Sequence, residues 1–304
     1  MTEIINILEQ GLLFALVAMG VYITYKILDF PDLSVDGTYP LGAAICGILI
    51  ANGINPWLSL LAALIGGAIA GGATAFLHVK LKITNLMSGI LVMIALYSVN
   101  LRVMGKSNIP LFNTNHIFKG KIMPIIIILG IVVMVKILFD LFLKTKTGYL
   151  LVAVGDNEQV VTALGVNKNL IKVIGLMISN GLVALAGGLT AQYQGFSEVS
   201  MGTGIVVTGL ASVIIGTSIF GKLSFMKVTT LSILGSIIYK VAVAIVLKIG
   251  LNPNDLKIMT ALIVVVALSA NSGIFKFKNK IRKEEKIENG GVKDVEDTEF
   301  MQSI

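Results

Sequence analysis

The chain has 304 residues, of which 55% are hydrophobic and only 13% are charged, and its formal net charge is +7. A composition this apolar cannot cover the surface of a water-soluble protein, which excludes an ordinary soluble domain. The basic excess falls in short loops and in the C-terminal tail, a distribution that indicates orientation in a membrane and not a nucleic-acid partner.

Apolar stretches of about 18 to 25 residues recur along the chain, and each can cross a hydrocarbon core of about 30 Å as a helix. We therefore expect an all-α, polytopic membrane bundle with about nine spans, within a range of about eight to ten. The expected spans lie near residues 8–28, 39–51, 57–79, 83–103, 122–142, 170–193, 204–220, 228–247 and 256–270. Residues 1–273 would form one transmembrane domain, and residues 274–304 a basic, then mixed-charge cytoplasmic tail without fixed structure.

The first apolar stretch follows no basic segment and precedes no small-residue cleavage site, so we expect a retained helix and not a signal peptide. Cys46 is the only cysteine, which excludes an intrachain disulfide. The histidines His78 and His116 lie far apart without the spacing of metal ligands. The sequence therefore predicts no metal site and no cofactor.

Loop charges predict the orientation, because Lys and Arg favour the cytoplasmic side. The Lys-rich tail, the loop at Lys80 and the region 144–172 would be cytoplasmic, whereas the loops near Ile54 and Glu198 would be external. With nine spans, Thr2 is external and Ile304 cytoplasmic. One external loop runs against this rule, since it carries the basic residues Arg102, Lys106, Lys119 and Lys121.

Residues 32–37, with the sequence DLSVDG, place acidic groups beside the short second span. Carboxylates at membrane depth are costly unless they face water, a partner or backbone donors. One interpretation is a broken helix whose Asp32, Ser34 and Asp36 line a polar path through the bundle. The other is a capped loop, with Asp36 or Thr38 as the N-cap of the next helix.

The later spans carry further polar and small residues. Lys136 and Asp140 are spaced i, i+4 and should pair with each other. Lys240 has no acidic neighbour at helical spacing, so it serves either the structure or the polar path. Asn85, Ser88 and Asn100 are further candidates for the path, with interhelical hydrogen bonding as the simpler account. Small residues predict close helix packing in two places, at Gly66, Gly67, Gly71 and Gly72, of which Gly67 and Gly71 have GxxxG spacing, and at Gly181, Ala184, Gly187 and Gly188.

A polar segment, 155–165, is set between two apolar stretches. It predicts a short helix with Asn157 as N-cap, Glu158 in the first turn and Gly165 at the end. The segment is either a docking surface for a partner or an ordinary interfacial loop helix.

Three motifs point to a known family: the segment 155–165, the DLSVDG sequence, and IGTS from Ile215 followed by Gly221 and Lys222. They resemble the permease subunits of ABC importers in the family that serves branched-chain amino acids and ribose, where DLSVG stands in place of DLSVDG. PLGAA from Pro40 and ALYSVNLR from Ala95 are similar to the permeases paired with tryptophan- or tyrosine-type binding proteins.

This resemblance implies a multi-pass protein of the bacterial cell membrane that moves a small solute into the cell, an amino acid, with an aromatic amino acid as the candidate. The implied partners are a cytoplasmic ABC ATPase, an extracytoplasmic substrate-binding protein, the lipid bilayer and a second permease copy, with no nucleic acid. It assigns ATPase coupling to Gly155, Asp156, Asn157, Glu158, Ala163, Leu164 and Gly165. It assigns the translocation pathway to Asp32, Ser34, Asp36, Asn85, Ser88, Asn100 and Lys240.

The chain has no GxxxxGK[ST] phosphate loop, so we expect a transport subunit that is not an enzyme and depends on a separate ATPase. The alternative is an autonomous secondary carrier of a small polar solute, with Lys240 or Asp36 as its coupling charge. An intramembrane enzyme would need a His/Glu metal motif or a Ser/His pair, which the sequence does not offer.

Overall fold

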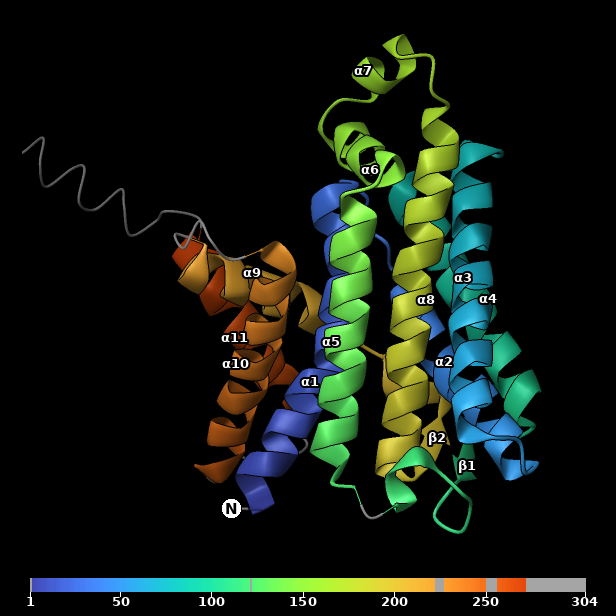
Figure 1. Cartoon of the computed structure of the whole chain (residues 1–304), viewed down its shortest axis with the longest axis vertical. Coiled ribbons are helices and arrows are strands. Elements are labelled where there is room, and N and C mark those ends of the chain that lie inside the picture. The colour runs from blue at the N-terminus through green and yellow to red at the C-terminus, as the bar shows by residue number, and fades with distance from the viewer. Residues whose placement is uncertain (1, 121, 222–226, 250–255, 272–304) are drawn as a thin grey trace, which may run out of the picture.

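Long helices lie side by side through most of the chain, with two short strands at one end of the bundle and two short helices at the other (Figure 1). The computed structural model describes residues 2–120, 122–221, 227–249 and 256–271. Lys222 and the tail 274–304, on which sequence-based expectations fell, lie outside the described residues.

The first part of the chain forms four helices. The helix α1 (Thr2–Tyr22) continues into a π-helical turn, η1 (Ile23–Ile27), which is followed by α2 (Val35–Ala51), α3 (Pro56–Val79) and α4 (Asn85–Met104). The strand β1 (Asn108–Pro110) and the 3₁₀ turn η2 (Ile117–Lys119) then lead to α5 (Pro124–Leu143).

The second part begins with two short helices, α6 (Lys146–Asp156) and α7 (Glu158–Ala163), and continues with the long α8 (Lys168–Gln194). The strand β2 (Phe196–Glu198) pairs antiparallel with β1 and leads into the 3₁₀ turn η3 (Val199–Gly202). The last helices are α9 (Ile205–Phe220), α10 (Val228–Lys248) and α11 (Leu256–Asn271).

The expected polytopic helical bundle is confirmed, but the count of nine spans is not. In the described part of the chain, seven helical segments are long and apolar enough to cross a membrane. They are Glu3–Ile27, Pro56–Val79, Asn85–Met104, Pro124–Leu143, Lys168–Gln194, Val199–Phe220 and Val228–Lys248. The helix α2 has 17 residues and falls below that length, although it begins four residues before the expected Tyr39.

Neither proposed N-cap of α2 is correct. The helix begins at Val35, and Ser34 occupies the N-cap position without a side-chain capping bond. Asp36 is the second residue of the helix, and Thr38 lies inside it with its hydroxyl donating to the Ser34 carbonyl at 3.0 Å. Both side chains therefore serve contacts other than the start of their own helix.

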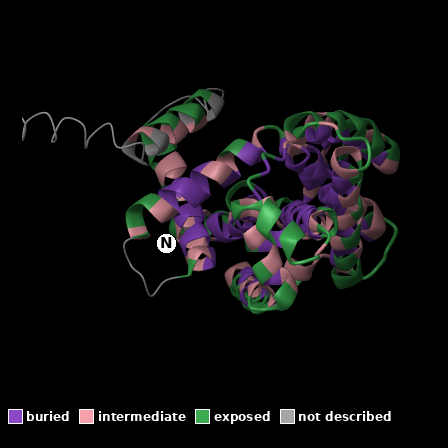
Figure 2. Cartoon of the chain, turned by 90° about the horizontal axis from the view of Figure 1, so that it is seen from above, coloured by how far each residue is buried: buried purple, intermediate pink, exposed green. Residues whose placement is uncertain are grey.

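The helix α8 is the centre of the bundle and packs against α1, α2 and α3. Residues buried in the structure gather where these helices face one another, and exposed residues face outward (Figure 2). The glycine spacing is used as expected, because a Cβ on Gly71 would collide with the carbonyl oxygen of Leu176 in α8. A side chain there would force α3 away from α8.

The two ends of the bundle are distinct. The N-terminus lies at the end opposite α7 (Figure 1), where the ammonium of Lys248 at the end of α10 is 3.5 Å from the carboxylate of Glu3. The strands β1 and β2 lie at this same end. Thr2 and the segment 155–165 are thus on opposite sides of the bundle, as the charge-based topology requires, while Ile304 lies outside the described residues.

Candidate functional site

Asn157 separates α6 from α7 and caps both. It is extended, with φ −158°, so its own amide closes α6 on the Ala153 carbonyl while its side chain accepts a bond from the Gln159 amide at 2.9 Å. Gly165 follows α7 with φ +73°, a left-handed conformation that glycine adopts without strain. The N-cap, first-turn and terminating residues predicted from the sequence are confirmed.

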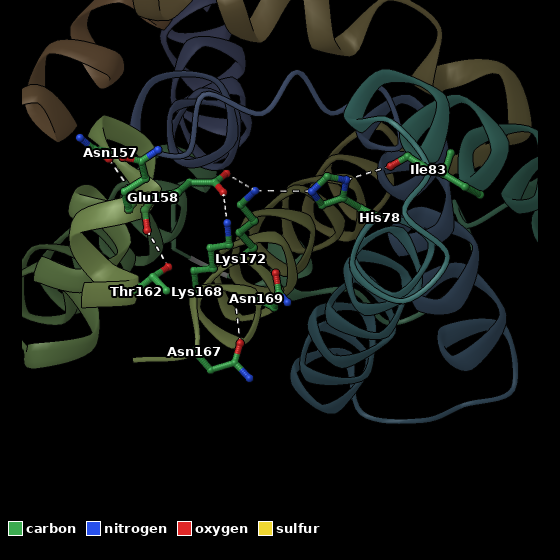
Figure 3. Close-up of polar contacts among 10 residues, drawn as sticks. His78, Ile83, Asn157, Glu158, Thr162, Asn167, Lys168, Asn169 and Lys172 are labelled. Carbon is green, nitrogen blue, oxygen red and sulfur yellow. Dashed lines mark hydrogen bonds and ion pairs between the residues drawn. The ribbon is translucent and has the colours of Figure 1, made fainter. Parts of the chain in front are cut away.

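Glu158 fastens α7 to the start of α8 (Figure 3). One carboxylate oxygen accepts from the Lys168 ammonium at 2.7 Å, and the other is in contact with the ammonium of Lys172. These two charge-assisted hydrogen bonds lower the pKa of Glu158 to about 2, so the carboxylate is ionised throughout the physiological range. The sequence placed Glu158 in the first turn but did not predict either lysine as its partner.

His78 extends this cluster to the loop after α3 (Figure 3). Its Nδ1 lies 2.9 Å from the Ile83 carbonyl oxygen, which can only accept, so Nδ1 carries the proton. Its Nε2 then faces the Lys172 ammonium at 3.5 Å. The group of Glu158, Lys168, Lys172 and His78, here called the α7 anchor, joins three parts of the chain at one end of the bundle.

The outward side of α7 carries large apolar side chains beside the exposed polar residues Gln159 and Thr162. Val161 is fully buried against the bundle, whereas Val160 and Leu164 are 50% and 67% exposed, and Tyr149 in α6 is 66% exposed. Asp156 and Ala163 are also exposed. An anchored helix with large apolar side chains facing away from its own core is suited to contact another protein.

Gly155 connects α6 to the broken region after α1. A Cβ on Gly155 would overlap the carbonyl oxygen of Ile27, the last residue of η1. The chain then turns at Asp29, which has a positive φ of 49°, and runs to Asp32. The end of the bundle that bears α7 is therefore in direct backbone contact with the break predicted from the sequence.

Asp32 and Ser34 lie in a closed hydrogen-bond network in the middle of the bundle. The Asp32 carboxylate accepts from the Ser34 amide at 2.9 Å and from the Asn180 side-chain amide at 2.8 Å. The Asn180 oxygen in turn accepts from Ser34 Oγ at 3.2 Å and from Thr38 Oγ1 at 2.7 Å. Asn180 was not predicted as a site residue, because its only signal in the sequence is an amide side chain within an apolar helix.

Asp36 binds the start of α9, far away in the sequence. Its carboxylate oxygens accept from the Gly204 amide at 2.9 Å and from the Val206 amide at 2.8 Å. A carboxylate at a helix N-terminus satisfies free amide groups and is favoured by the helix dipole. Asp36 thus ties α2 to α9.

A cavity of about 510 Å³ lies beside Asp36, between α2, α4 and η3. Its wall consists of Asp36, Gly37, Pro40, Met93, Ile94, Tyr97, Ser98, Asn100, Val199, Ser200 and Thr203. Asn100 is fully buried, and its Nδ2 donates to the Gly37 carbonyl at 3.1 Å. Its Oδ1 has no hydrogen-bond partner among the described residues.

The other candidates for the path are not brought to this cavity. Ser88 is buried at the far end of α4, where its hydroxyl donates to the Thr84 carbonyl at 2.9 Å, and Asn85 begins the same helix. Lys240 lies in α10 with its ammonium 3.7 Å from the centre of the Phe14 ring. The structure therefore joins Asp36 with Asn100, joins Asp32 with Ser34, and leaves Asn85, Ser88 and Lys240 apart.

Two further polar clusters hold helices together. Asp140 pairs with Lys136 at 2.9 Å as predicted, and also accepts from Lys227 at 2.9 Å and from the Thr229 hydroxyl at 2.7 Å. The buried Glu9 in α1 accepts from the Tyr193 hydroxyl at 2.7 Å. Within the described residues, no group of three or more His, Cys, Asp or Glu side chains could hold a metal ion.

Comparisons with known proteins agree with this architecture. Residues 3–269 match the family model described as "Branched-chain amino acid transport system / permease component". The tyrosine transport system permease protein of Clostridioides difficile (strain R20291) is 52% identical over 272 residues, covering 90% of this chain and 92% of that protein. The ribose import permease protein RbsC of Escherichia coli (strain K12) is 26% identical over 229 residues, covering 72% and 70%.

The fold is also seen in a solved structure, PsaBC from Streptococcus pneumoniae in complex with Fab. The TM-score is 0.53 at 14% identity, with 86% of this chain and 89% of that chain covered. At this identity the match supports the shared fold alone.

A multi-pass helical bundle with a short anchored helix at one end is the architecture of a membrane transport permease. The chain belongs to the branched-chain amino acid transport system permease family and is the permease component of an ABC importer. This assignment replaces the alternative of an autonomous secondary carrier.

Proposed function

We propose that this permease imports an amino acid with an aromatic side chain, tyrosine being the first candidate. The observation that carries the proposal is the 52% identity to a permease named for tyrosine transport, which extends over 90% of the chain. The cavity beside Asp36, where an aromatic ring, aliphatic side chains and polar groups share one wall, is compatible with such a solute.

Transport would be powered by a separate cytoplasmic ATPase that docks on α7 and the exposed part of α6. The support is structural: the α7 anchor fixes the helix through Glu158, while Val160, Leu164 and Tyr149 face outward. Removal of such side chains from water is favourable by about 25 cal/mol per Å² of apolar surface, before the costs of association are subtracted. An interfacial loop helix without a partner would have no comparable reason to be anchored while exposing these side chains.

The solute would be delivered by an extracytoplasmic binding protein at the end that carries β1 and β2, and two permease copies would form the path. Membership in the family of ABC importer permeases supports the ATPase and the binding protein, whereas the second permease copy is part of the proposal. The end with β1 and β2 lies opposite α7, as import toward the ATPase side requires.

Reconstitution in liposomes tests the proposal. The purified permease would be combined with its cognate ATPase and binding protein. Uptake of labelled tyrosine, leucine and ribose would then be measured with and without ATP on the side of the membrane that bears the ATPase. We expect ATP-dependent uptake of tyrosine with little uptake of ribose. Preferred uptake of ribose would overturn the substrate class, and equal uptake without ATP would overturn the role of the ATPase.

A further inference from the structure

The cavity between α2, α4 and η3 has unused hydrogen-bond acceptors. Asp36 is the only charged residue in its wall, and Asn100 contributes a buried side-chain oxygen that has no partner among the described residues. The Ser200 hydroxyl, also in the wall, donates to Glu198, so a second carboxylate lies beside this site. The wall thus combines negative charge with free acceptors.

The Asp36 carboxylate can accept a further hydrogen bond after it has capped α9. An ionised carboxylate offers about four lone-pair positions, and the amides of Gly204, Ile205 and Val206 at the start of α9 occupy up to three of them. A helix N-terminus supplies only about half of one positive charge. A negative charge and about one acceptor position therefore remain for a ligand. Arg102, the nearest basic residue along α4, is not part of the wall.

Asn100 is held in place by the donor that it gives to Gly37. Its remaining oxygen is buried, and an unpaired buried acceptor is costly, so a donor from a bound molecule would be favoured there. Asp36 and Asn100 together favour a ligand that carries hydrogen-bond donors and a positive charge.

The rest of the wall is suited to an apolar body. Pro40, Met93, Ile94 and the Tyr97 ring form this side of the cavity, whose volume of about 510 Å³ lies within the range of small-molecule sites. An aromatic ring can stack on the Tyr97 ring, and a cation can lie over it.

We infer that this cavity binds the solute through a primary ammonium group at Asp36 and Asn100, with an apolar or aromatic body against Tyr97. The site accepts amines and zwitterionic amino acids and rejects the matching carboxylate that lacks the amine. This inference rests on the proposed import of an amino acid and assigns the chemical group by which the permease itself recognises it.

The test uses a cysteine in the cavity wall. Cys46 is buried and is the only native cysteine, so Ser98→Cys introduces one accessible thiol into the purified full-length permease. Ser107→Cys, at an exposed serine just beyond α4, is the matched control outside the wall. Each thiol is modified with a trimethylammonium methanethiosulfonate and with its sulfonate counterpart, and the ratio of the two rates is measured.

We expect the cation-to-anion rate ratio at Ser98→Cys to exceed that at Ser107→Cys by about 25-fold, because one negative charge at contact distance in water speeds the cation about fivefold and slows the anion about fivefold. Asp36→Asn, which can still accept from α9 through its oxygen, should abolish the difference. Tyramine should slow the modification of Ser98→Cys, whereas 3-(4-hydroxyphenyl)propionate, the same body without an amine, should not.

Equal ratios at the two thiols, or equal protection by the two phenols, would overturn the inference. If Asp36→Asn does not fold, two comparisons still test the inference: the rate ratios of the two thiols in proteins that keep Asp36, and the protection by the two phenols. These measurements need neither ATPase nor binding protein, so they are separable from the proposed function. Normal charge preference without ATP-driven tyrosine uptake would contradict the function, and uptake without charge preference would contradict only this site.

Discussion

Gly155 in α6 packs directly on the backbone carbonyl of Ile27, at the end of the π-helical turn. From there the chain runs through Asp29 to Asp32 and Ser34, whose network includes Asn180, and two residues later Asp36 holds the start of α9 beside the cavity. This is a continuous series of packed contacts between α7 and the cavity. We hypothesise that movement of α6 and α7 is transmitted along it.

Gly155→Ala tests the first contact. The added methyl group would collide with the Ile27 carbonyl and displace α6, at a cost of about 1–3 kcal/mol. We expect reduced ATP-dependent transport with a folded bundle, measured by uptake and by thermal unfolding. Gly130→Ala in α5 is the control, because a Cβ there meets nothing within 4 Å. Equal transport by the two variants would show that the contact between Gly155 and Ile27 does not affect transport.

Glu158→Gln should loosen α7. Because the folded pKa of about 2 lies below the ordinary value of 4.5, the stabilisation by the carboxylate is present above about pH 4.5 and is lost as the pH falls toward 2. Glu158 is 40% exposed, so its contribution is about 1 kcal/mol or less.

We therefore expect ATPase binding by the native permease to be constant between pH 6 and pH 8, and weaker at every pH in this range with Glu158→Gln. Co-purification at several pH values measures it. Glu3→Gln, at an exposed glutamate that pairs with Lys248 at the opposite end of the bundle, is the control. Loss of ATPase binding by the native protein within that range would contradict the role given to Glu158.

Lys240→Met should assemble and transport normally. The ammonium lies against the Phe14 ring, apart from the cavity, and methionine keeps the apolar stem in place. We expect loss of about 0.5–2 kcal/mol of stability from the cation–π contact, measured by thermal unfolding. Abolished transport by a stable Lys240→Met protein would assign this lysine to the pathway after all.

Asp140→Asn should destabilise the contact between α5 and α10 more than Lys136→Met does. Asp140 is 8% exposed and has Lys136, Lys227 and Thr229 as partners, whereas removal of Lys136 leaves two of these bonds intact. We expect a loss of about 1–3 kcal/mol for Asp140→Asn and about 1 kcal/mol or less for Lys136→Met. Thermal unfolding in detergent compares them, and the reverse order would be inconsistent with three shared bonds.

A cysteine at Thr2 should be modified from outside the cell by an impermeant reagent, and a cysteine at Gln159 should not. The two positions lie at opposite ends of the bundle, and the loops near α7 carry the basic residues. Labelling of both from the same side would require a different topology.

Local patterns predicted local structure well. Asn157, Glu158 and Gly165 form the short helix that their cap chemistry indicates, and Lys136 pairs with Asp140 because both stand on one helix face. The helix α6 was not predicted as a separate helix, because no turn signal separates its apolar residues from the polar segment that follows.

Long-range relationships were beyond the sequence. Asp36 was considered as a cap for its own helix, but the amides that it satisfies belong to Gly204 and Val206, and only the folded bundle brings them together. The partners of Glu158 and the Asn180 network likewise depend on how α8 lies against the rest of the chain. The depth in the membrane at which α2 begins could not be predicted either, since this helix starts inside the bundle beside Asn180.

The central claim is that an ATPase binds the outward side of α7. Leu164→Asp places a charge on that side, where Leu164 is 67% exposed, and Leu58→Asp is the matched control in the first turn of α3 at the opposite end, where Leu58 is 58% exposed and a carboxylate is tolerated. Both proteins should remain folded.

The decisive measurement is co-purification of the ATPase with each variant, together with ATP-driven uptake after reconstitution. We expect Leu164→Asp to lose most of the bound ATPase and at least about tenfold of the uptake, the effect of about 1.4 kcal/mol, while Leu58→Asp keeps both. Full ATPase binding and uptake by a folded Leu164→Asp permease would show that the ATPase does not dock on α7.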